Sequence, residues 1–181
     1  MLDKFEVAEE FGPYRFIGKS VYCRAWQDNT IAIQRGTWKY CDWVFETLDN
    51  MKEYASDVVY NCSLWTFEKF DNEKQLMGYT IGRFMKANTP VPEGMDYFEI
   101  EATAVAKGLT EGKIEDFNSF DRINKGFPSG KPTFDAIEER TNYEEASSKW
   151  SATVCPVGFL KNPLPDINGK YYAGPFVPVK Q

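Results

Sequence analysis

The hydrophobic positions of this chain follow two different periods. Between residues 37 and 55, apolar side chains recur at steps of three or four, which is the spacing of one face of an α-helix. Elsewhere, Val, Tyr, Trp and Phe gather in short runs that alternate loosely with polar residues, as strands do. These runs occupy residues 14–26, 57–70, 75–87, 97–108 and 149–161. The pattern predicts a mixed α+β fold.

The order of these elements is the same in both halves as far as the pattern can be followed. The first half is strand, helix, strand, strand, with "DNEK" as the turn of a hairpin. The segment "NTPVPEGM" (88–95) contains two prolines and a glycine and predicts a linker. A strand, a less regular helical region and a further strand follow. Residues 162–181 predict a tail with one short edge strand at 170–173.

Two pairs of similar segments suggest an internal repeat. "YRFIGKSVYCRA" (14–25) and "YFEIEATAVAKG" (97–108) share Tyr, Ile, Ser or Thr, and Arg or Lys at the same four places. "YTIGRFMKANTPVP" (79–92) and "ATVCPVGFLKNPLP" (152–165) follow in the same order. We therefore expect duplicated β-α-β-β units that form one antiparallel sheet, with helices on one face and a central cleft for a ligand. The expected organisation is a single domain over 1–181, with repeat one at about 14–87, linker 88–95, repeat two at about 96–161 and tail 162–181.

Composition excludes several classes of function. The net charge of −6 disfavours direct nucleic-acid binding. No apolar stretch approaches the ~20 residues of a membrane span, so we expect a cytoplasmic protein without a membrane partner. The chain has no histidine, and none of its four cysteines has C-x-x-C spacing. We therefore expect no metal and no cofactor. Aromatic residues make up 16% of the chain and are suited to lining a pocket for flat ligands.

The stretch "GYTIGRFMKANTPVPEGMDYFEIEATAVAKGL" (78–109) resembles the central part of the gyrase-inhibitor-like (GyrI-like) domains. These are similar to the effector-binding domains of AraC-type and multidrug-responsive regulators and to the SOUL group. The resemblance covers roughly residues 14–160. It implies two strand-helix-strand-strand units and a cleft for flat, hydrophobic or cationic molecules. Because only thirteen residues precede Tyr14, we expect the stand-alone branch, whose members resemble drug-sequestering proteins or hydrolases of reactive compounds.

One departure from the family changes the expected chemistry. Family members often carry a buried Glu in a last-strand pattern like W-x-x-E-x-Y-P. In "WSATVCPVGF" (150–159), Thr153 and Cys155 stand where the Glu and Tyr would be. A buried carboxylate can pair with a cation or act as a base, and Thr153 can do neither. Recognition of a cation by a carboxylate would need another Glu in the cleft.

Seven residues are candidates for ligand binding: Trp43, Trp65, Tyr79, Trp150, Thr153, Glu68 and Glu101. Each has a structural alternative. Trp65 is equally suited to the core, and Trp43 to a partly exposed helix surface. The alternatives for Glu68 and Glu101 are solvated carboxylates on a wet face or edge.

The sequence favours a binding protein over an enzyme. The expected partner is a small hydrophobic, aromatic or cationic molecule held by burial and ring stacking, in a protein linked to transcription regulation. A hydrolase that uses Tyr79 with Glu68 or Glu101 is the alternative. A third interpretation is a regulator that acts through protein contacts. A protein partner or a homodimer is left open, as is the ligand's identity.

Overall fold

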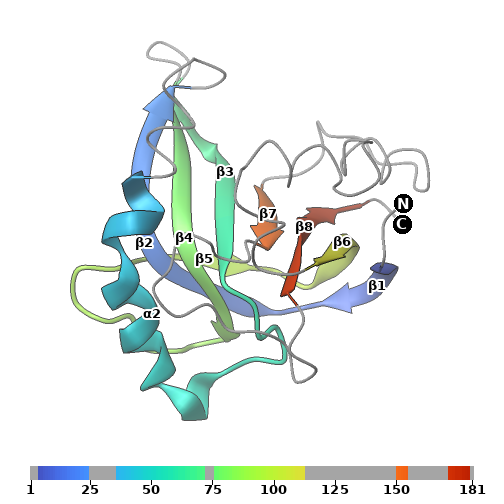
Figure 1. Ribbon diagram of the computed structural model, residues 1–181, viewed down its shortest axis with the longest axis horizontal. Helices are drawn as coiled ribbons and strands as arrows, with labels where there is room; N and C mark the ends of the chain where they lie inside the picture. The colour runs from blue at the N-terminus through green and yellow to red at the C-terminus, as the bar shows by residue number, and fades with distance from the viewer. Residues whose placement is uncertain (1–3, 25–35, 72–75, 113–149, 155–170, 180–181) are drawn as a thin grey trace. The chain divides into compact units, whose positions relative to one another are not determined.

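The computed structural model describes residues 4–24, 36–71, 76–112, 150–154 and 171–179 (Figure 1). The chain divides into two compact units. The central unit is Gly12–Ala102, and the terminal unit combines Met1–Phe11 with Thr103–Gln181. Each unit is built around an antiparallel sheet, so the fold is α+β with few helices.

The central unit contains four strands within its described residues. They are β2 (Tyr14–Arg24), β3 (Cys62–Asp71), β4 (Leu76–Lys86) and β5 (Asp96–Ile100), in the order β3-β4-β2-β5. Residues 36–40 are helical, followed by α2 (Asp42–Asp49) and the 3₁₀ helix η1 (Lys52–Tyr54). The predicted hairpin and the helical period after residue 37 are confirmed, although α2 ends at Asp49. The strand predicted from residue 57 begins at Cys62.

The terminal unit has the same strand order as the central unit. Its described strands are β1 (Lys4–Phe11), β6 (Thr103–Gly112), β7 (Trp150–Val154) and β8 (Tyr171–Pro178), in the order β7-β8-β6-β1. The two orders agree if β6, β7, β8 and β1 are matched with β2, β3, β4 and β5. The sequence pattern missed β1, because "KFEVAEEF" is too acidic to alternate clearly. The helical pattern expected between 113 and 148 lies outside the described residues.

The segment 97–108 is not one strand, so this prediction was wrong. It is divided between β5 and β6 at Glu101 and Ala102, and the two strands belong to different units. β5 ends at Ile100 because β2, the strand it pairs with, begins at Tyr14. Tyr14 lies opposite Ile100, and no residue of β2 remains to pair with the chain beyond that point. The echo between 14–25 and 97–108 therefore does not align two equivalent strands.

The prediction of a short edge strand at 170–173 was also wrong. β8 runs from Tyr171 to Pro178 and pairs with β6 on one side and β7 on the other. Pro175 and Pro178 argued against a central strand, since proline donates no ladder hydrogen bond. Each proline nonetheless occupies a paired position, opposite Thr153 and Val105 respectively.

The sheet of the central unit has two distinct faces. Side chains alternate along β4, so Tyr79, Ile81 and Arg83 share one face. The helical segment covers this face through the apolar residues Trp38 and Phe45, and we call it the helix face. The opposite face, which we call the far face, carries the even-numbered residues of β2, β3 and β4.

A close contact between β2 and β4 depends on glycine. Gly18 lies opposite Gly82, and a Cβ on either residue would overlap a backbone carbonyl of the facing strand, from Ile81 or Ile17. The strands meet more closely here than any side chain would allow, and β2 follows a curved path (Figure 1). The terminal unit repeats the contact, because a Cβ on Gly174 in β8 would overlap the carbonyl of Gly108 in β6.

We predict that Gly82→Ala lowers the free energy of unfolding by about 3 kcal/mol or more, because the added methyl meets backbone that cannot move aside. Gly36→Ala is the control, since no atom lies within 4 Å of its new methyl. Urea unfolding of both variants measures the difference. Equal stability of the two variants would contradict the close contact.

Tyr14 makes stability depend on alkaline pH. Its hydroxyl donates a hydrogen bond of 2.6 Å to Asp57 Oδ1. Burial, together with the hydrogen bond and charge of Asp57, raises the pKa of Tyr14 to about 12 from its ordinary value of 10.0. The folded state thus favours the neutral phenol. This stabilisation is complete below pH 10 and is lost as the pH rises through about 12.

We therefore expect the stability difference between the wild type and Tyr14→Phe to shrink as the pH rises from 9 to 12. Urea unfolding at stepped pH measures both proteins, and the titration of lysines cancels in the difference. A difference that stays constant across this range would exclude the coupling between Tyr14 and Asp57.

Candidate functional site

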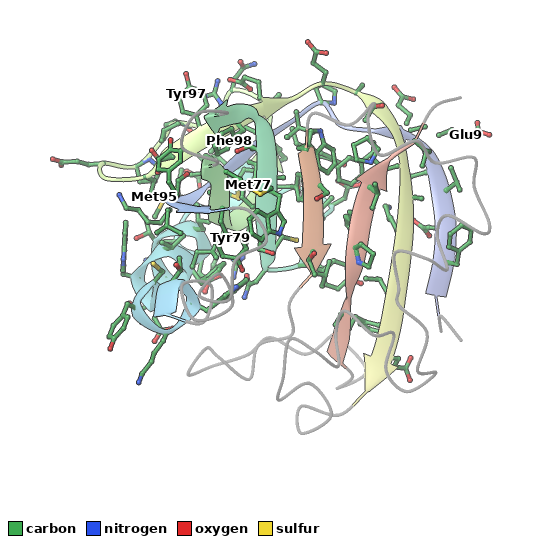
Figure 2. All side chains as sticks on the ribbon, turned by 90° about the horizontal axis from the view of Figure 1, so that it is seen from above. Glu9, Met77, Tyr79, Met95, Tyr97 and Phe98 are labelled. Carbon is green, nitrogen blue, oxygen red and sulfur yellow. The ribbon has the colours of Figure 1, made fainter. Side chains whose placement is uncertain are left out.

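Two of the predicted ligand residues meet on the helix face of the central unit. The rings of Trp65 and Tyr79 lie 4.8 Å apart between centroids. Tyr79 is only 1% exposed, and its hydroxyl accepts a hydrogen bond of 2.7 Å from the indole nitrogen of Trp38. Trp38 in turn stacks on Phe45, with 5.6 Å between ring centroids (Tyr79 is labelled in Figure 2). These rings form the packing between the helical segment and the sheet.

Arg83 closes the same face at its other end. Its Nε donates to Asn61 Oδ1 at 2.5 Å, and its Nη1 forms an ion pair with Asp49. The guanidinium lies 5.5 Å from the centre of the Phe45 ring. Its Nη2 is buried without a hydrogen-bond partner within the described part of the chain. Arg83 is therefore a mostly buried cation that ties β4 to α2.

The remaining sequence candidates do not converge with this pair. Trp43 is 39% exposed, on the side of α2 away from its buried residues. Glu101 is exposed in the break between β5 and β6. Glu68 lies in β3, but its side chain is outside the described set. Trp150 and Thr153 are both buried in β7, on opposite faces of that strand by its alternation.

The terminal unit holds a cation between aromatic rings. Lys107 Nζ lies 5.5 Å from the ring centre of Phe11 and 5.6 Å from that of Phe176. Its charge is paired with Glu6 at 2.7 Å. Phe11 also packs against Trp150, with 6.1 Å between ring centroids. The aromatic cluster around Trp150 thus already contains a positive charge of the protein itself.

The far face of the central unit has a different composition. The central part of this face has four rows of residues across β2, β4 and β3. The rows are Phe16 and Phe84, then Gly18, Gly82 and Cys62, then Ser20, Thr80 and Leu64, and finally Tyr22, Gly78 and Thr66. Aromatic rings stand in the first and last of these rows, and the residues between them are smaller, apart from Leu64. Tyr22 is 53% exposed, whereas Phe16, Leu64 and Thr80 are each 0% exposed, so most of this part of the face is covered in the folded chain.

Hydroxyl groups line the small-residue part of the far face. Ser20 Oγ and Thr80 Oγ1 share a hydrogen bond of 2.7 Å. Thr66 Oγ1 lies 2.5 Å from the position that a Cβ on Gly78 would take, so its hydroxyl leans over that glycine. The residue is 4% exposed, and the oxygen is buried without a hydrogen-bond partner in the part of the chain that the structure describes. Such a group is costly unless something satisfies it.

The sequence analysis missed these far-face residues. Ser20, Tyr22, Thr66 and Thr80 lie in predicted strands, but none of them was a candidate for ligand binding. A signal was present, because the glycines and hydroxyl residues of β2 and β4 recur every second residue. Their meeting on one face required the pairing register, which no local pattern gives.

No group of three or more Cys, Asp and Glu that could hold a metal occurs among the described residues. Within the same residues, no helix is long and apolar enough to cross a membrane.

The fold of this chain is similar to that of SAV2435. The match has a TM-score of 0.61 at 11% sequence identity and covers 98% of this chain and 94% of SAV2435, whose structure was solved bound to tetraphenylphosphonium. At this identity the likeness establishes the fold.

A second solved structure is a candidate bacterial transcription regulation protein from Staphylococcus aureus MU50. It matches with a TM-score of 0.49 and 14% identity, over 98% of this chain and 97% of the other. No protein-family model and no curated protein matches the sequence.

We predict that Tyr79→Phe lowers the free energy of unfolding by about 1–3 kcal/mol, because it removes the acceptor of the buried Trp38 indole N–H. Tyr22→Phe is the matched control on an exposed tyrosine of the same sheet, and it should change stability by no more than about 0.5 kcal/mol. Thermal or urea unfolding compares the two. Equal effects would show that the bond to Trp38 contributes nothing specific.

Proposed function

We propose that this chain binds small aromatic molecules, hydrophobic or cationic, against the far face of the central unit. The composition of that face carries the proposal. Glycines at positions 18, 78 and 82 contribute no side chain, so their backbone forms a floor, and the rings of Phe16, Phe84 and Tyr22 lie beside it, with Tyr22 at the exposed edge. A flat ligand can lay its apolar area on such a floor and stack against the bordering rings, worth about 0.5–1.5 kcal/mol per ring pair.

The fold supports the proposed class of ligand. SAV2435, which has a similar fold, was solved with tetraphenylphosphonium, a hydrophobic aromatic cation. The net charge of −6 favours cations over anions of the same shape. We extend the proposal to the role expected from the GyrI-like resemblance, a stand-alone effector-binding or drug-sequestering protein linked to transcription regulation.

We also propose that the two units arose by duplication. The support is their common strand order and the glycine contact at the same place in each, Gly82 on Ile17 and Gly174 on Gly108. This alignment matches "YTIGRFM" with "YYAGPFV" and replaces the echo at 152–165. An experimental structure in which β2, β3 and β4 do not superpose on β6, β7 and β8 would refute the duplication.

The contacts do not favour the hydrolase alternative. It needs a tyrosine and a carboxylate side by side. Tyr79 is buried and bonded to Trp38, while Glu101 is exposed in a connection between strands; the side chain of Glu68, the other carboxylate of this alternative, lies outside the described residues. We therefore retain binding as the proposed function.

Tetraphenylphosphonium tests the proposal directly. Isothermal titration calorimetry should give a dissociation constant in roughly the micromolar range, about −8 kcal/mol. Tetraphenylborate has the same shape and the opposite charge, and it should bind at least about tenfold more weakly. The proposal fails if the phosphonium ion and a flat cation such as ethidium both show no binding at about 1 mM.

Two exposed tyrosines locate the site. Tyr22 stands on the far face, whereas Tyr40, 76% exposed, lies in the helical segment. Tyr22→Ala should weaken binding of tetraphenylphosphonium about 2- to 12-fold through loss of ring contact, and Tyr40→Ala should leave it unchanged. Titration of both variants measures this. If Tyr40→Ala has the larger effect, the ligand binds on the helical side instead.

A further inference from the structure

The hydroxyl of Thr66 restricts the kind of ligand that suits the far face. It comes from the central region of β3, is 4% exposed, and has no hydrogen-bond partner among the described residues. Burial does not allow bulk water to satisfy it at no cost, because a hydroxyl removed from water without a partner is destabilising. In a buried setting, a hydrogen bond that a ligand offers is also stronger than it would be in water.

The surroundings decide what kind of partner fits. Thr66 leans over Gly78, and the next row holds the bonded pair of Ser20 and Thr80. This pair uses one of its two hydroxyl protons in the bond between its members. Thr66 and the pair can therefore present O–H donors beside a floor of glycine. The row of Gly18 continues into β5 with Asp96, whose carboxylate accepts a hydrogen bond of 3.0 Å from the backbone N–H of Ser20, so one acidic group borders these hydroxyls.

We infer that the preferred ligand of this face is a flat aromatic molecule that carries a hydrogen-bond acceptor on its rim, such as a ring nitrogen or a ring carbonyl, and that Thr66 donates to this acceptor. The inference rests on the proposed function and narrows its ligand class. The apolar body lies on the glycines between Phe16 and Tyr22, and the acceptor meets the hydroxyl. Tetraphenylphosphonium has no such acceptor, so it uses only the apolar part of the site.

A pair of probes separates the acceptor from the apolar body. Quinoline and naphthalene have the same shape, but only quinoline has a ring nitrogen, which is uncharged at pH 8. Titrations of the full chain, followed by tryptophan fluorescence or by the NMR signals of the probe, should show quinoline binding about 3- to 10-fold more tightly than naphthalene. Thr66→Val, which keeps the shape of the side chain, should abolish this preference. Thr66→Ser, which keeps the hydroxyl, should retain it.

Stability of the ligand-free protein gives a second readout. A hydroxyl without a partner can be replaced by a methyl at no loss, so the urea midpoint of Thr66→Val should equal or exceed that of the wild type. A clear fall in the midpoint would show that the protein itself already satisfies Thr66, and the inference would be wrong. It would also be wrong if quinoline retained its advantage in Thr66→Val.

The outcomes distinguish the two proposals. If quinoline and naphthalene bind the wild type equally, and bind Thr66→Val just as well, only the acceptor is disproved and the apolar site remains. If neither probe binds the wild type and tetraphenylphosphonium does not bind either, the proposed function and this inference fail together.

Discussion

The close approach of β2 to β4 is the constraint on which the central unit depends. Gly18 and Gly82 face each other where either would otherwise drive a methyl into the opposing backbone. The contact has two consequences. It brings the strands together along a curved path (Figure 1), and it leaves two positions of the far face without a side chain. The feature that shapes the sheet therefore also places bare glycine backbone on that face.

The two faces of this sheet are built differently. The helix face is stabilised by specific polar contacts within its packing, the bond from Trp38 to Tyr79 and the contacts of Arg83 with Asn61 and Asp49. A face built in this way holds the helical segment in one position. The far face combines small residues with a buried Thr66 hydroxyl that has no hydrogen-bond partner in the described part of the chain, a combination that packing alone does not explain.

Part of this arrangement could be predicted from the sequence. The α+β class, the hairpin of β3 and β4 and the helical period after residue 37 follow from spacing alone. The similarity between 14–25 and 97–108 does not align two strands, because it crosses the break at Glu101. The proposed match of Gly82 with Gly174 was hidden by Pro175 and Pro178, which are unfavourable in a central strand and so obscured β8.

The sequence by itself determined which residues alternate, where the helical period lies, and that the chain is acidic, rich in aromatic rings and without histidine. These properties depend on composition and on near neighbours. The tertiary structure alone decided that Tyr79 packs against Trp38, and that Ser20, Thr66 and Thr80 share one face. The physical reason is strand register: it is set by contacts between segments about 60 residues apart, and a shift of one residue would turn every side chain to the other face.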